Sequence, residues 1–96
     1  MQARTSTWAG APEALEAWAA HVREHVAPMV AGIPGIAGAC FLLDREAGEA
    51  VTMTLWQTEE AARASDATAD ASRASTVAAT GVELRRRGRY EVVGRI

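Results

Sequence analysis

Residues 36–43 are almost wholly apolar, Ile-Ala-Gly-Ala-Cys-Phe-Leu-Leu, and they constrain the fold more than any other part of the chain. A short apolar run without polar alternation is typical of a β-strand that is covered on both faces. The polar segment 44–49 contains a glycine and predicts a turn, and in residues 50–56 Thr and Trp alternate with Val, Met and Leu. We therefore predict an antiparallel hairpin of residues 36–43 and 50–56.

A helix is predicted on each side of this hairpin. Pro12 fits the first position of a helix, and the residues that follow it at helical spacing form one apolar stripe: Leu15, Trp18, Val22, Val26 and Met29. Pro28 is expected to distort the last turn of that helix. Thr58 suits the cap of a second helical region that is rich in Ala, Ser and Thr, that breaks near residues 65–69 or runs on unbroken, and that ends at Gly81.

Strands are also predicted at both ends of the chain, over residues 3–8 and 82–96, with a bulge or bend at Gly88. The resulting order β-α-β-β-α-β predicts a single α+β domain of the ferredoxin-like class over residues 1–96. In that class a four-stranded antiparallel sheet carries both helices on one face.

Such a fold leaves one face of the sheet bare, whereas the apolar side chains of residues 36–43 point to both faces. By simple alternation Ile36, Cys40 and Leu42 share one face, and Phe41 and Leu43 share the other. We expect Phe41 on the face that the helices do not cover and Cys40 as a buried, inert thiol. Pairing with a second copy of the chain would bury this bare face, so a homodimer is predicted.

Composition excludes several classes of function. The net charge of −2 predicts no nucleic-acid partner, and no apolar run has the length of a membrane helix. The single cysteine suits a reducing cytoplasm. No phosphate-binding loop, dinucleotide fingerprint or cluster of metal ligands is present, so no cofactor and no metal are predicted.

His21 and His25 are the best candidates for acid–base catalysis, because no other side chains of the chain titrate near neutral pH. Their spacing of four on a helix is also compatible with metal binding, but no Glu, Asp or Cys stands at a supporting offset. They lie at the boundary of the apolar stripe, so a position in a pocket and a position in solvent both remain open.

Aromatic and arginine side chains supply the other candidates. Trp18 belongs to the apolar stripe, and Trp56 ends a strand, where it can form the wall of a pocket. Arg86 alternates with its neighbours so that it points with Leu84 and Tyr90 toward apolar residues. It is either an ion-pair partner across the dimer or an anchor for an anionic or phenolate substrate. We therefore predict catalytic roles for His21, His25 and Arg86, and substrate binding by Trp18, Trp56 and Tyr90.

The segments "STWAGAPEALEAW" from Ser6, "IPGIAGACFLLDREAGEAVTMTLWQTEEAARAS" from Ile33 and "RYEVV" from Arg89 resemble the antibiotic biosynthesis monooxygenase superfamily, the dimeric α+β barrels. The resemblance implies a homodimer whose two sheets face each other, with a pocket in each subunit between the helices and the sheet. In the haem-degrading branch an Asn near the first strand and a Trp and His on the second helix are essential. Their counterparts here are Ala3, Ser65 and Ser75, which disfavours haem breakdown.

The resemblance implies a monooxygenase-like protein that binds a small apolar, aromatic molecule and oxidises it with O₂ without a cofactor. In that reading Arg86 stabilises a substrate anion, a histidine accepts a proton, and Trp56 forms the pocket wall. The alternative is a non-catalytic dimer of the same fold that binds a ligand or serves in assembly.

Overall fold

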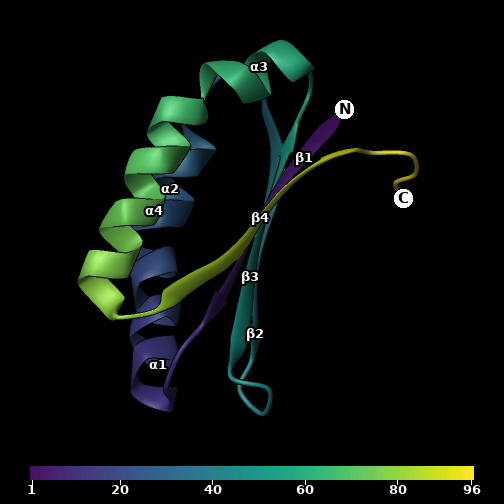
Figure 1. The fold of residues 1–96 in the computed structure, drawn as a ribbon. Helices are drawn as coiled ribbons and strands as arrows, with labels where there is room; N and C mark the ends of the chain where they lie inside the picture. Colours follow the sequence, from purple (N-terminus) through teal and green to yellow (C-terminus); the bar gives the residue numbers. More distant parts are fainter.

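The computed structural model describes residues 1–96 and contains one four-stranded antiparallel sheet (Figure 1). The strands lie in the order β2-β3-β1-β4, so that the first and third strands form the centre of the sheet. Their bounds are Gln2–Ala9 for β1, Ile36–Asp44 for β2, Glu49–Trp56 for β3 and Glu83–Glu91 for β4. The predicted hairpin is therefore β2-β3, and the strands at both chain ends pair beside it.

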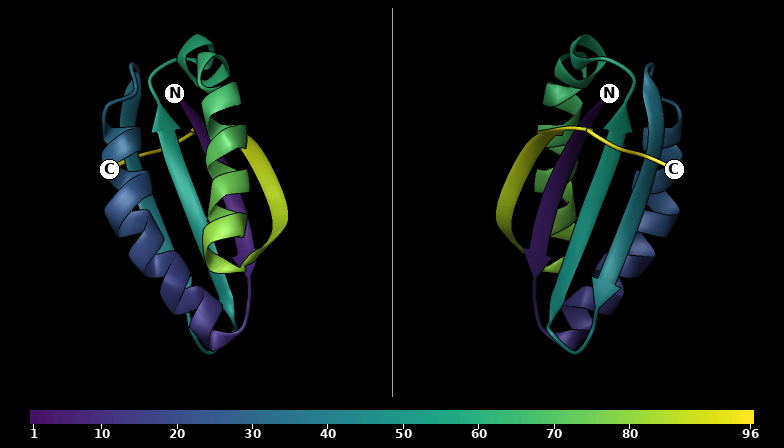
Figure 2. Two further views of the ribbon diagram at one scale, coloured as in Figure 1. Left: turned by 90° about the vertical axis from the view of Figure 1, so that its left-hand side faces the viewer. Right: turned by 90° about the vertical axis from the view of Figure 1, so that its right-hand side faces the viewer.

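All helices lie on one face of this sheet, and the other face carries only the C-terminal tail (Figures 1 and 2). The first helical region consists of α1 (Pro12–His21), a π-helical turn η1 (Val22–Val26) and α2 (Ala27–Ala31). The second consists of α3 (Glu59–Ala64) and α4 (Asp66–Thr80). The predicted α+β, ferredoxin-like class is confirmed. None of the helices combines the length and the apolar character of a membrane-spanning segment.

The first helical region is distorted one turn earlier than predicted. Pro28 has no N–H to donate to the carbonyl of Glu24, and its ring crowds that carbonyl. Glu24 lies within the π-helical turn, which accommodates the lost bond by widening the helix. Leu15, Trp18, Val22 and Val26 still face the sheet and are buried.

The second helical region is interrupted at Ser65. Of the two predicted alternatives, a broken and an unbroken helix, the structure therefore has the broken one. The Thr58 side chain accepts a hydrogen bond of 3.0 Å from the Ala61 N–H and so caps α3. Gly81 ends α4 in the left-handed conformation, with φ of 82°. Thr76 is the only buried residue within α4, so this helix has little apolar contact with the rest of the chain.

The hydrophobic core lies between the first helical region and the sheet. Its buried members are Trp8, Leu15, Trp18, Ala19, Val22, Val26, Val30, Ala50 and Val82. Phe41 and Leu43 pack against this cluster from β2. The expectation that Phe41 lies on the uncovered face is therefore wrong. An irregularity between Ile36 and Gly38 shifts the register of β2 and brings Ile36, Phe41 and Leu43 to the helix side.

The uncovered face carries the alternate residues of the same strands. Cys40 and Leu42 of β2 pair with Met53 and Val51 of β3, and all four point away from the helices. Leu42 is 53% exposed, and Cys40 is also exposed rather than buried as expected. The chain by itself thus leaves an apolar sheet face open to solvent.

The bulge in the last strand lies at Arg85 rather than at Gly88. Gly88 pairs with Thr5 of β1 in regular register. Farther along β1, Thr7 pairs with Arg86 and Trp8 pairs with Leu84, so Arg85 is left without a partner. This shift sends Arg87 and Arg89 to the helix side of the edge strand. They pair there with aspartates of α4.

The turn between α2 and β2 depends on the absence of a side chain at Gly35. Its φ is +84°, and a Cβ there would overlap the Cβ of Ala61 in α3. We expect Gly35→Ala to lower the free energy of unfolding by about 2 kcal/mol, from left-handed strain and overpacking together. Gly32→Ala is the control, because φ is −91° there and the nearest atom to a new Cβ lies at 3.6 Å. Equal urea midpoints for the two variants would contradict this account of the turn.

Candidate functional site

A cavity of about 60 Å³ lies between the helices and the sheet. Alternation along the two central strands turns one set of side chains toward it, since Arg4 faces Thr54 and Ser6 faces Thr52 across the β1-β3 pair. The first helical region closes one side and α4 the other. The lining residues are Arg4, Ser6, Trp8, Trp18, Val22, Val26, Met29, Val30, Ile33, Thr52, Thr54, Trp56, Ser65, Thr68, Ala69, Ser72, Arg73 and Thr76.

Three tryptophans surround this cavity, and two of them use their indole N–H within the sheet. Trp8 donates to Thr52 Oγ1 at 3.1 Å, and Trp56 donates to Thr54 Oγ1 at 2.9 Å. Trp18 is 1% exposed, and its Nε1 has no hydrogen-bond partner in the chain. A buried donor without an acceptor is rare and costs free energy. The Trp18 N–H is therefore free to donate to an oxygen of a bound molecule.

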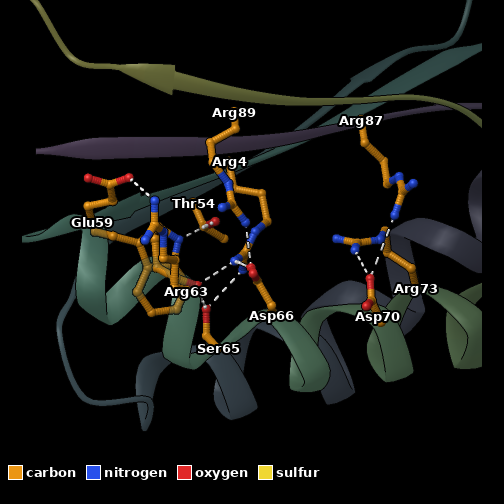
Figure 3. A network of polar contacts seen from close by, with 12 residues as sticks. Arg4, Thr54, Glu59, Arg63, Ser65, Asp66, Asp70, Arg73, Arg87 and Arg89 are labelled. Carbon is orange, nitrogen blue, oxygen red and sulfur yellow. Dashed lines mark hydrogen bonds and ion pairs between the residues drawn. The ribbon is translucent and has the colours of Figure 1, made fainter.

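Two arginines, Arg4 and Arg73, lie at the cavity wall, and Arg4 is held on three sides (Figure 3). Its guanidinium donates to Ser65 Oγ at 3.0 Å, to the Ala62 carbonyl at 2.6 Å and to the Asp66 carboxylate. It also lies over the Trp56 ring, 5.5 Å from the centroid. Burial lowers the pKa of Arg4 below its usual value, and Asp66 opposes that effect.

Sequence reasoning did not single out Arg4, although a signal was present. Trp8 and Ser6 are buried at alternate positions of β1, and the same period of two places Arg4 on the buried side. An arginine on the inner face of a central strand needs several acceptors. The break between α3 and α4 supplies them, because it turns Ser65 and the last carbonyls of α3 toward the sheet.

The sequence-predicted site residues do not all lie together. Trp18 and Trp56 line the cavity. His21 and His25 are close to one another, with ring centroids 5.2 Å apart, but neither lines the cavity and the His25 side chain is 68% exposed. No group of three or more His, Cys, Asp or Glu side chains is arranged to hold a metal.

Arg86 and Tyr90 lie on the uncovered face of the sheet, on the opposite side from the cavity. Tyr90 pairs with Ala3 and Arg86 with Thr7, and both of those residues of β1 point away from the helices. Arg86 donates to the Tyr90 hydroxyl at 3.0 Å. Arg86 and Tyr90, which were predicted as site residues, therefore do not line the observed cavity. The bulge at Arg85 accounts for this, because it reverses the direction of the side chains that follow it in β4.

The cavity lining contains no His, Asp, Glu or Cys. The side chains that surround it can stack on an aromatic ring, donate hydrogen bonds and stabilise a negative charge, but none of them can accept a proton near neutral pH. The cavity thus offers aromatic surface, hydrogen-bond donors and positive charge, but no side-chain base.

Comparison with known proteins gives the chain its family. The family model described as antibiotic biosynthesis monooxygenase matches residues 1–76. The uncharacterized proteins Rv2557 and Rv2558 of Mycobacterium tuberculosis are 36% and 38% identical to the chain over 63 residues, which is 66% of this chain. The matched region spans only 28% and 27% of their own lengths.

Two solved structures have the same fold. A monooxygenase from the gene ActVA-Orf6 of Streptomyces coelicolor, in complex with nanaomycin D, has a TM-score of 0.78 at 16% identity, over 99% of this chain and 89% of that one. SnoaB, a cofactor-independent oxygenase from Streptomyces nogalater, has a TM-score of 0.69 at 19% identity, over 99% of this chain and 95% of that one. The structural likeness extends over the whole fold, and the family model covers most of the sequence. The chain belongs to the antibiotic biosynthesis monooxygenase family.

Proposed function

We propose that this chain is a monooxygenase-like protein that binds a small apolar, aromatic molecule in the tryptophan-lined cavity and oxidises it with O₂ without a bound cofactor. The observation that carries the proposal is Trp18, which lines the cavity and whose buried indole N–H has no acceptor in the chain. A ring oxygen of a ligand would satisfy it. The family, and the fold shared with the cofactor-independent oxygenase SnoaB, support the same chemistry.

The size of the cavity limits what fits without movement. A volume of about 60 Å³ is far below the several hundred Å³ typical of pockets for drug-sized ligands. A molecule with one or two rings is therefore the expected ligand, and even this requires α4 to move outward. Apolar packing opposes that movement little, because Thr76 is the only buried residue of α4, and its main resistance is the ion pairs of Asp66 and Asp70.

The proposed chemistry uses the substrate as its own reductant. Oxidation of a ring CH₂ to a carbonyl by one O₂ releases one water, and the substrate supplies all four electrons. A substrate that already carries an acidic hydroxyl or CH₂ loses that proton to water, since no lining side chain accepts it. Arg4 then stabilises the anion, and the apolar walls exclude bulk water from the reacting ring.

The test compares indane with 1-indanone, which differ by one oxygen acceptor. Calorimetry should give the ketone an affinity about fivefold higher in the wild-type protein, the value of one hydrogen bond. In Trp18→Phe that difference should vanish, because the aromatic ring remains and the N–H is lost. An unchanged preference for the ketone in Trp18→Phe would remove the indole from the site.

Turnover is tested separately with indane-1,3-dione, a two-ring compound with an acidic CH₂, under air and after dialysis of the protein against a chelator. We expect consumption of O₂ together with appearance of the 1,2,3-trione, above the rate without protein. Binding of both indane compounds without any turnover of the dione would favour the non-catalytic alternative.

The proposal includes a homodimer in which the uncovered sheet faces of two chains meet. The support is the row of apolar side chains on that face, which the helices leave exposed. In such a dimer Arg86 and Tyr90 would lie at the subunit interface rather than in the cavity.

A further inference from the structure

A polar cleft of about 380 Å³ opens between α4 and the edge strand β4 (Figure 3). Four arginines and two aspartates line it: Arg4, Arg73, Arg87, Arg89, Asp66 and Asp70. Arg87 and Arg89 reach it from β4, because the bulge at Arg85 sets both on the helix side of the strand. The two aspartates reach it from successive turns of α4.

The ion pairs of this cleft leave positive charge in excess. Asp66 Oδ1 is shared between Arg4 and Arg89, with Arg89 at 2.5 Å. Asp70 Oδ1 is shared between Arg73 and Arg87, with Arg87 at 3.7 Å. Each carboxylate thus faces two guanidinium groups. The cleft carries two positive charges more than negative ones, in a chain whose net charge is −2.

Arg73 is largely buried and has few hydrogen-bond partners in the chain. Its side chain is only 14% exposed, and its one hydrogen bond in the chain runs from Nη2 to Asp70. The other guanidinium nitrogens of Arg73 have no acceptor in the chain. Guanidinium groups bind carboxylates through two parallel hydrogen bonds, so this arrangement is suited to a further carboxylate.

The cleft adjoins the apolar cavity, because the side chains of Arg4 and Arg73 line both. A molecule that moves these two side chains apart can place a ring among the tryptophans and a charged group among the arginines. We infer that the ligand is an aromatic carboxylic acid whose ring enters the cavity and whose carboxylate binds in this arginine cleft. The inference rests on the proposed function and specifies the substrate class of the same site.

The experiment compares 2-naphthoate with 2-naphthamide, which have the same rings and differ in charge. Calorimetry at low salt should show that the wild-type protein prefers the carboxylate by about tenfold or more, as charge-assisted hydrogen bonds predict. The double variant Arg87→Gln/Arg89→Gln changes the cleft without touching the cavity lining. It should lose that preference and bind the amide as the wild-type protein does. Arg45→Gln/Arg63→Gln is the control, since it removes the same charge from exposed sites outside the cleft.

Each outcome separates the two proposals. If both ligands bind equally in the wild-type protein and the double variant, the arginine cleft has no part in binding and only the proposed function stands. If neither ligand binds, both proposals fail. If inorganic phosphate competes with the carboxylate but the amide does not bind, the cleft is a site for free anions, which overturns the inference of a single aromatic acid.

Discussion

Replacement of Arg4 by methionine is expected to lower the free energy of unfolding by about 3 kcal/mol. Methionine keeps the aliphatic part of the side chain but removes the donors to Ser65, the Ala62 carbonyl and Asp66. Ser65 and Ala62 are buried and lose a partner, whereas Asp66 is 45% exposed and regains water. For a chain of this length the loss corresponds to a fall in melting temperature of more than about 10 °C.

Arg63→Met is the matched control for that experiment. Arg63 pairs with Glu59 on the surface of α3, with 67% of its side chain exposed, so the same substitution should cost less than about 0.5 kcal/mol. Thermal and urea unfolding at one protein concentration measure both variants. If Arg4→Met is as stable as the wild-type protein, Arg4 is held for its ligand and not for the fold.

Replacement of Leu42 by aspartate is expected to weaken self-association by about a hundredfold or more, because a dimer would bury two unpaired carboxylates. Leu42 points away from the helices and is 53% exposed in the single chain. The fold of the chain itself should therefore tolerate the change. Phe41→Asp should act differently, since Phe41 packs against the core and its replacement should unfold the chain.

Sedimentation velocity at micromolar concentration separates these outcomes, with circular dichroism as the measure of folding. Ala47→Asp is the control, because it adds the same charge in the exposed turn between β2 and β3. A wild-type protein that sediments as a monomer of 10.2 kDa would refute the dimer. A Leu42→Asp protein that sediments as the wild type does would place the interface elsewhere.

The sequence predicted those parts of the fold whose signals are local. The turn after residue 43 and the alternation that follows it identify the β2-β3 hairpin. Thr58 and Gly81 mark the ends of the second helical region through capping chemistry that acts within a few residues. The order of these elements was enough to predict the ferredoxin-like sheet.

The site was harder to predict because it depends on register. One irregularity in β2 moves Phe41 to the core, and one bulge in β4 moves Arg87 and Arg89 to the helix side. A shift of a single residue exchanges the side chains on the two faces of a strand. Neither strand contains a residue type from which the position of the shift could be predicted. Arg86 was selected and Arg4 was overlooked for the same reason, since only the pairing of the strands shows which arginine lies inside.

The uneven attachment of α4 makes the cavity sensitive to its ionic surroundings. Along one side this helix is joined to the sheet by the pairs of Asp66 and Asp70 with arginines of β1 and β4, and apolar burial contributes little. Dissolved ions screen exposed charge pairs over a distance of about 10 Å at 0.1 M, but they leave hydrophobic packing in place. We therefore expect rising salt to weaken the exposed pairs of Arg87 and Arg89 with α4, while the Arg4 pair and the packing of α1 on the core remain. On this account, entry to the interior would depend on electrolyte at the β4 side of α4 and not at the α1 side.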